Sequence, residues 1–237
     1  MTSKPPQSSF KAAEEFAAWF TPEALHPDLE KHVRRDNALG SCIHHPLVIQ
    51  VFHVPQMNKM VNAQYANKLR AVAEARAARE WDRFVFLHER PYRLDALLQV
   101  LPKLTGTRKG WKLIEEVWTD AEGVGINFDA WETIFSSGGA RLMMNTKERR
   151  AFDVLPESVE VYRGAKHKHR RGFSWTLSRE KAEWFAQRFD MRGAVLLSRT
   201  IAPARDALAL LLGRGEDELL LRPHVARSLR GVRVDPL

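Results

Sequence analysis

The segment Glu216-Asp217-Glu218-Leu219-Leu220-Leu221 places two carboxylates, one residue apart, at the start of an aliphatic run. The run has the composition of a buried strand. Because residues i and i+2 of a strand point to the same face, Glu216 and Glu218 are expected to project side by side, with Asp217 facing the other way. Two like charges held together repel each other unless a ligand or a cation uses them. The segment therefore indicates either a solvated turn before a strand or a functional site.

Two short motifs upstream lie in the same β-rich part of the chain. Tyr162-Arg163-Gly164 ends a predicted strand that begins at Val159, and Ser174 and Thr176 share one face of a predicted strand at 173–177. Ser178 is predicted to cap a helix that runs to about Phe189. Further strands are predicted at 194–201, 219–221 and 228–234, whereas 204–212 suits a helix or a strand equally well.

The part of the chain before residue 150 is predicted to be mainly helical. Its clearest helix spans 56–81, and segment 45–54 is a strand or a helix. Shorter helices are predicted at 9–20, 94–101 (stopped by Pro102), 111–118, 128–135 and 146–152. The tryptophans expected to anchor its core are Trp81, Trp111, Trp118 and Trp131. The sequence thus predicts an α+β protein with a disordered tail at 1–8, a helical region at 9–150 and a compact β-rich core at 151–237, the last two packed together as one unit.

Composition narrows the class of partner. The chain of 237 residues has a formal net charge of +8, and residues 151–237 hold 16 Lys and Arg against 11 Asp and Glu. Such an excess favours an anionic partner, such as a nucleic acid, an acidic protein surface or a phosphate-bearing ligand. The single cysteine, Cys42, excludes an intramolecular disulfide and lacks the spacing of a zinc site. The N-terminal residues lack the apolar stretch of a signal peptide and no run is long enough to span a membrane, so a cytoplasmic protein without a metal is expected.

The order of the three motifs resembles that of a known enzyme family. An arginine on one strand, a Ser-x-Thr strand and a Glu-x-Glu segment that opens an aliphatic strand are typical of mono-ADP-ribosyltransferases of the Arg-Ser-Glu class, which include bacterial toxins and phage enzymes that act on arginine. The segment Ala182–Ala186 resembles the helix that follows the serine motif in that family. The resemblance covers residues 159–223 and implies an ADP-ribosyltransferase-type core in the cytoplasm of the producing or infected cell.

The chain departs from the family in the interval between the first two motifs. Only 11 residues separate Arg163 from Ser174, and the loop 165–171 is packed with Lys, His and Arg. No helix fits between the motifs, which leaves the detail of the nicotinamide pocket open. The loop itself suits a solvated surface, or a contact with NAD phosphates or with an acidic target.

The resemblance implies a role for each site residue. The transition state for cleaving the nicotinamide–ribose bond of NAD resembles an oxocarbenium ion, and Glu218 is expected to stabilise it and hold the ribose 2′-hydroxyl. Ser174 is expected to position Glu218 by a hydrogen bond, and Thr176 to support the strand and pocket. Arg163 is expected to clamp a phosphate or ribose oxygen, and Gly164 to let the backbone approach the nicotinamide amide.

By the same resemblance, Glu216 selects the acceptor. An arginine guanidinium has a pKa above about 12 and is a poor nucleophile while protonated. A neighbouring carboxylate steers it and helps to remove its proton. The expected partners are therefore NAD, as substrate, and a target protein that carries an acceptor arginine, including a protein associated with nucleic acid.

Three other interpretations stay open. The first is a basic nucleic-acid-binding protein without NAD chemistry, which explains the charge but not the ordered motifs. The second is a transferase that modifies nucleic acid. The third is a NAD glycohydrolase without an acceptor.

Overall fold

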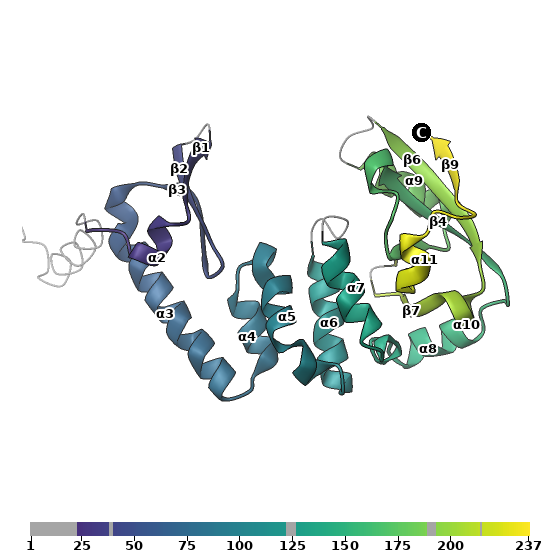
Figure 1. Ribbon diagram of the computed structural model, residues 1–237, viewed down its shortest axis with the longest axis horizontal. Helices are drawn as coiled ribbons and strands as arrows, with labels where there is room; N and C mark the ends of the chain where they lie inside the picture. The colour runs from purple at the N-terminus through teal and green to yellow at the C-terminus, as the bar shows by residue number, and fades with distance from the viewer. Residues whose placement is uncertain (1–22, 38–39, 122–126, 189–192, 214) are drawn as a thin grey trace, which may run out of the picture. The chain divides into compact units, whose positions relative to one another are not determined.

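The computed structural model describes residues 23–37, 40–121, 127–188, 193–213 and 215–237 (Figure 1). It divides into two compact units, Met1–Leu97 and Leu98–Leu237. The predicted α+β class is confirmed, with helices prominent in the N-terminal half and the larger sheet in the C-terminal part. The boundary predicted after residue 150 falls inside the second unit. The tail predicted at 1–8 and the helix predicted at 9–20 lie outside the described residues.

The first unit combines a three-stranded antiparallel sheet with helices. Its strands, in sheet order, are β1 (Val33–Asn37), β2 (Gly40–His45) and β3 (Val48–His53). Its helical segments are α2 (Pro27–Glu30), η1 (Pro55–Met57), α3 (Asn58–Ala77), α4 (Trp81–Leu87) and η2 (Arg90–Tyr92), followed by the start of α5 (Arg93–Leu104). Leu29, Ile43, Val48 and Val61 are fully buried and join the sheet to α2 and α3.

Two features of this unit differ from the prediction. The sheet lies inside the region predicted to be helical, because the apolar run after His45 was equally compatible with either structure. The helix predicted over 56–81 is two helices, since Arg79 between α3 and α4 has a left-handed φ of 57° that no continuous helix accommodates.

The second unit is built on a six-stranded sheet in which all neighbouring strands are antiparallel. The sheet order is β7 (Ala207–Leu211), β8 (Glu218–Leu221), β5 (Ser174–Thr176), β4 (Val159–Lys166), β6 (Ala194–Ile201) and β9 (Arg233–Pro236). The other elements are α6 (Arg108–Asp120), α7 (Phe128–Ser136), η3 (Ala140–Leu142), α8 (Thr146–Asp153), η4 (His167–His169), α9 (Arg179–Gln187), α10 (Pro203–Asp206) and α11 (Pro223–Arg227).

Most predicted elements of this unit are confirmed, with two corrections. Pro102 does not stop α5 at Leu101, since the helix continues to Leu104. A proline so close to a helix end removes only one of the last backbone hydrogen bonds. The segment 204–212, which suited a helix or a strand equally well, contains both, because the short helix α10 is followed directly by strand β7.

Aromatic side chains from α6 and α7 form the core against the sheet. Trp118 packs edge-on against Trp131, with ring centroids 4.8 Å apart, and against Phe135 at 5.3 Å. Phe135 in turn contacts Phe173 at 5.1 Å, immediately before β5. All four rings are buried, as is Trp111, whereas Trp81, which was also predicted to anchor a core, is only partly buried. Helices α6 and α7 and the strands after residue 150 thus share one core.

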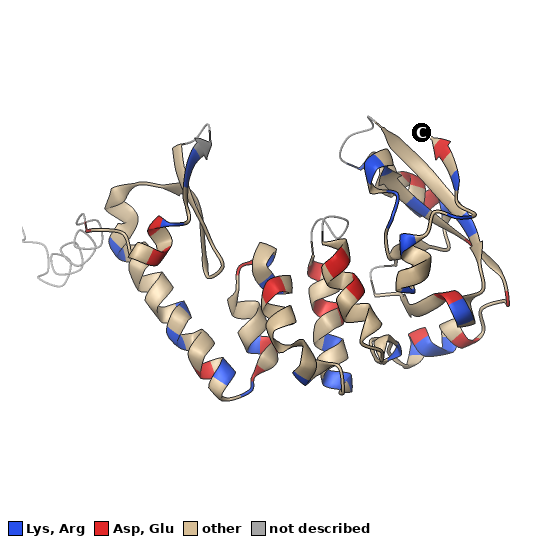
Figure 2. Ribbon diagram, in the orientation of Figure 1, with Lys and Arg blue, Asp and Glu red and all other residues tan. Residues whose placement is uncertain are grey.

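Charged side chains of both signs are interspersed along the helices of both units (Figure 2). Within the described ranges, no helix combines the length and the apolar character needed to cross a membrane.

Gly164 in β4 is predicted to be indispensable for stability. A Cβ atom there would lie 1.9 Å from the carbonyl oxygen of Ala182 and 2.5 Å from the backbone nitrogen of Ala186, both in α9. We expect Gly164→Ala to lower the free energy of unfolding by about 2 kcal/mol or more, because helix α9 must move off the sheet. Urea unfolding measures the change. Gly106→Ala is the control, since its Cβ would meet nothing within 4 Å; similar losses in both variants would contradict the close contact.

Candidate functional site

The sheet brings the three sequence motifs onto adjacent strands. Thr176 in β5 pairs with Tyr162 in β4 on one side and with Glu218 in β8 on the other. Arg163 follows Tyr162 directly, so the arginine, serine/threonine and glutamate motifs lie next to one another although 55 residues separate Arg163 from Glu218. The structure therefore brings the predicted site residues together.

The Glu218 carboxylate is held by a residue of the helical region. Trp118 Nε1 in α6 donates a hydrogen bond of 3.1 Å to Glu218 Oε1. The Trp118 side chain is 3% exposed and fixed by Trp131, Phe135 and Phe173. A donor with so little freedom fixes the direction of the carboxylate that it binds.

Arg163 lies beside the same carboxylate, in a largely enclosed environment. Its Nη1 donates a 2.7 Å hydrogen bond to the carbonyl oxygen of Ser174, and its Nε is buried without a hydrogen-bond partner among the described residues. Burial lowers the pKa of the guanidinium to about 10, and the nearby Glu218 charge opposes this shift. The arginine remains a cation at neutral pH. A side chain on Gly172 would collide with it, since a Cβ there would lie 2.4 Å from Arg163 Cζ.

The serine motif acts through other atoms than we predicted. Ser174 was expected to position Glu218 with its side chain, but the hydrogen bond seen on that carboxylate comes from Trp118, and Ser174 accepts the Arg163 bond through its backbone. Thr176 Oγ1 donates to the carbonyl oxygen of Glu216 at 2.7 Å and accepts from the backbone nitrogen of Ser178 at 3.1 Å. Thr176 thus supports the site as predicted, by fixing the backbone that leads to Glu218.

The expected parallel projection of the two glutamates is wrong. Strand β8 begins at Glu218, and Glu216 lies in the bend before it. Asp217 between them has a left-handed φ of 48°, so the two-residue repeat of a strand does not apply. Lys181 Nζ in α9 holds this conformation through a 2.5 Å ion pair with Asp217 Oδ2. Both glutamates are half-buried, but Glu218 belongs to the sheet and is hydrogen-bonded to Trp118, whereas Glu216 lies outside the strand.

Helix α9 contacts Gly164 and carries Trp184. The missing side chain of Gly164 makes room for α9, and its expected role beside nicotinamide stays a prediction. Trp184 is 57% exposed, with the guanidinium of Arg188 over its ring.

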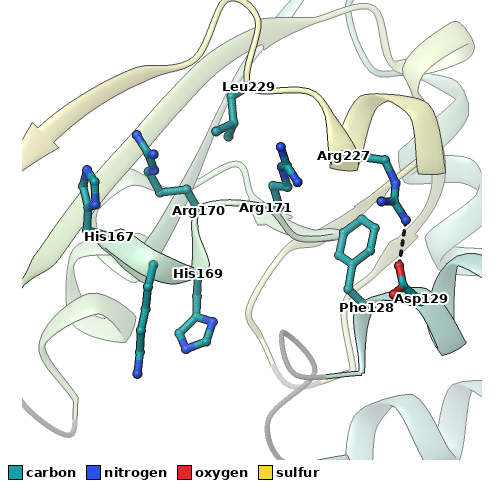
Figure 3. Close-up of a pocket in the computed structure, with 9 residues that line it drawn as sticks. Phe128, Asp129, His167, His169, Arg170, Arg171, Arg227 and Leu229 are labelled. Atoms are coloured by element: carbon teal, nitrogen blue, oxygen red, sulfur yellow. Dashed lines mark hydrogen bonds and ion pairs between the residues drawn. The ribbon is translucent and has the colours of Figure 1, made fainter.

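A basic cavity of about 490 Å³ lies next to these strands (Figure 3). Its lining comes from the loop after β4, from α7 and from the region of α11, and comprises Phe128, Asp129, His167, Lys168, His169, Arg170, Arg171, Arg227 and Leu229. Phe128 stacks on Phe173 with ring centroids 4.5 Å apart. The basic loop thus approaches the chain that enters Ser174.

The sequence did not indicate that Trp118, Phe128 and Arg227 contribute to the candidate site or to the cavity beside it. The helical spacing of aromatics predicted a core role for Trp118, and this is correct, but no pattern pairs its indole N–H with a glutamate 100 positions away.

Comparison of the chain with protein-family models, with curated proteins and with solved structures finds no match.

The Trp118–Glu218 hydrogen bond can be tested against a matched neighbour. Trp131 belongs to the same aromatic cluster, but its Nε1 is buried without a partner in the described part of the chain. Both Trp→Phe changes remove similar volume, but only Trp118→Phe leaves a carboxylate oxygen without its donor. We expect Trp118→Phe to lower the free energy of unfolding by about 1–2 kcal/mol more than Trp131→Phe does. Denaturant titration measures both; equal losses would show that the bond contributes nothing.

Proposed function

We propose that this chain is a mono-ADP-ribosyltransferase that cleaves NAD at the nicotinamide–ribose bond and transfers ADP-ribose to an arginine of a target protein. The observation that carries the proposal is the meeting of Arg163, the Ser174/Thr176 strand and Glu218 on three adjacent strands. The same three motifs carry the resemblance to the Arg-Ser-Glu class, and their convergence in space is what that chemistry requires.

In the first half of the reaction, positive charge moves from the nicotinamide ring to the ribose. As the C1′–N bond breaks, its electron pair leaves with neutral nicotinamide and positive charge develops on the ribose. A carboxylate already fixed beside that carbon stabilises this charge without reorganising at the moment of reaction. The Trp118 bond to Oε1 provides such fixation for the Glu218 carboxylate. Arg163 places a positive charge close to this carboxylate.

The second half joins the ribose to the acceptor. An arginine nitrogen forms a bond to C1′, and the proton that it releases passes to Glu216. Glu216 suits this role because it lies outside the strand in a partly exposed bend, where a protein substrate has access. Its backbone is fixed by Thr176 and its neighbour Asp217 by Lys181, so the bend has a defined position next to Glu218.

One observation favours a second candidate, a nucleic-acid-binding protein. The loop 167–171 presents consecutive basic side chains around an open cavity, an arrangement suited to phosphate groups. Binding of DNA or RNA that weakens steeply with salt, without any consumption of NAD, would favour this candidate. Consumption of NAD without a labelled protein or nucleic acid would identify a glycohydrolase.

The decisive assay is incubation of the full chain with NAD labelled in its adenylate portion and a cell lysate. A labelled protein band that resists nuclease and has the hydroxylamine sensitivity of an arginine adduct supports the proposal. Label that is lost on nuclease treatment would instead indicate a nucleic-acid acceptor.

Glu218→Gln is expected to abolish both partial reactions. The amide retains the shape but loses the charge that stabilises the oxocarbenium-like state, so NAD hydrolysis and protein labelling should both fall at least about a hundredfold. Release of nicotinamide measures the first and the labelled band the second. Glu180→Gln, on the exposed first turn of α9, is the control. Wild-type activity in Glu218→Gln would refute the site.

Glu216→Gln is expected to separate the two partial reactions. NAD hydrolysis should stay within about threefold of wild type, whereas transfer to arginine should fall at least about a hundredfold, because only transfer needs a proton acceptor for the guanidinium. The same two readouts measure this ratio. If the variant labels arginine at the wild-type rate, Glu216 does not select the acceptor.

A further inference from the structure

The basic cavity has a defined set of walls. Consecutive residues of the β4–β5 connection, including η4, supply one wall, and Phe128, Arg227 and Leu229 supply the other. Figure 3 shows the side chains of Arg170 and Arg171 projecting to the same side of the loop, with Phe128 and Arg227 across the opening. A volume of about 490 Å³ falls in the range of small-molecule sites.

The cations of this cavity differ in whether they are already neutralised. Arg227 forms ion pairs with Glu132 and, at 2.8 Å, with Asp129, and these pairs raise the pKa of Arg227. Arg227 therefore cancels the one carboxylate in the lining. In the described part of the chain, Lys168, Arg170 and Arg171 make no ion pair. The cavity thus has uncompensated positive charge concentrated on the loop side.

Adjacent arginines suit phosphate groups for geometric reasons. Each guanidinium presents a planar fork of donors that binds two phosphate oxygens at once, which a lysine ammonium does not. Two such forks from consecutive residues, together with Lys168, match two linked phosphates better than a single anion. The chemical class of ligand that this cavity recognises is therefore a diphosphate.

The cavity is connected to the candidate site through three consecutive residues. Arg171 lines the cavity, Gly172 packs against the Arg163 guanidinium, and Phe173 contacts Trp118, the donor to Glu218. The backbone nitrogen of Gly172 also donates to the carbonyl oxygen of Ala226 in α11, which fixes the end of the loop. The residues that line the cavity are thus continuous in sequence with those that pack around Arg163 and Trp118.

We propose that the cavity formed by residues 167–171, Phe128 and Arg227 binds the diphosphate of the NAD substrate, with Arg170 and Arg171 as its main ligands. This assignment rests on the proposed function. It transfers the phosphate contact first expected from Arg163 to the loop, since the Arg163 Nη1 is already used by Ser174 and its Nε is enclosed.

The charge of the cavity excludes the other substrate of the reaction. The acceptor is itself a guanidinium cation, which the unpaired Lys168, Arg170 and Arg171 would repel. The acidic segment Glu216–Glu218 offers the opposite sign. The two substrates are thus assigned to separate surfaces, with the anionic one at the basic loop and the cationic one at the bend before β8.

The test is binding of ADP to the full chain, because ADP carries the diphosphate but cannot react. We expect wild type to bind ADP in a calorimetric titration and inorganic pyrophosphate to displace it. The double variant Arg170→Gln/Arg171→Gln should weaken ADP binding at least about tenfold, since two charge-assisted contacts are lost. The control is Lys147→Gln/Arg150→Gln, which removes the same charge from the α8 segment outside the cavity and should leave ADP affinity within about twofold.

Three outcomes would overturn the assignment. They are no ADP binding by wild type, equal ADP affinity in the loop variant and the control, or binding of a single-stranded oligonucleotide of about 20 nucleotides that ADP and pyrophosphate fail to displace. The result is independent of turnover. Loop-dependent ADP binding in a protein that never cleaves NAD would support the diphosphate site while refuting the proposed function.

Discussion

The aromatic cluster of Trp118, Trp131, Phe135 and Phe173 is the contact on which the second unit depends. It joins α6 and α7 to the residue that precedes β5, so the helices and the sheet share one buried core. Because a packed core allows little side-chain movement, Trp118 is rigid, and its indole N–H has a fixed direction. The position of the Glu218 carboxylate is therefore a consequence of core packing, and the helical segment from Leu98 to Asp153 belongs to the site as much as the strands do.

A second constraint is the tight spacing around Arg163. Gly172 lets the guanidinium lie against the loop backbone, and Gly164 on the neighbouring position of β4 lets α9 approach the sheet. Helix α9 then reaches Asp217 through Lys181 and holds the bend that carries Glu216. Because these two glycines lack side chains, Arg163 can pack against the loop and α9 can lie close enough to the sheet for Lys181 to reach Asp217. The negative charge of Glu218 favours the cationic form of Arg163 and so opposes the effect of burial on the Arg163 pKa.

Positive and negative side chains gather in different parts of this unit. Their positions indicate where each substrate of the proposed reaction would bind. The loop 167–171 carries cations without an ion pair among the described residues, whereas Glu218 opens strand β8 and Glu216 lies just before it. The diphosphate of one substrate and the guanidinium of the other would each meet complementary charge, and each would be repelled by the surface assigned to the other. The interval between Arg163 and Ser174 is short, so the basic loop directly joins the strands that carry these two residues.

Local patterns determined much of this protein. Capping by Ser178, the strand at 194–201 and the amphipathic helices at 111–118 and 128–135 were predictable because each depends on neighbours within a few positions. The ordered motifs also indicated which strands carry the site. Only the tertiary structure decided which atoms meet there: Trp118 rather than Ser174 holds Glu218, and a left-handed Asp217 separates the two glutamates. Those contacts join residues up to 100 positions apart, and their geometry follows from sheet order and core packing, which no local sequence pattern encodes.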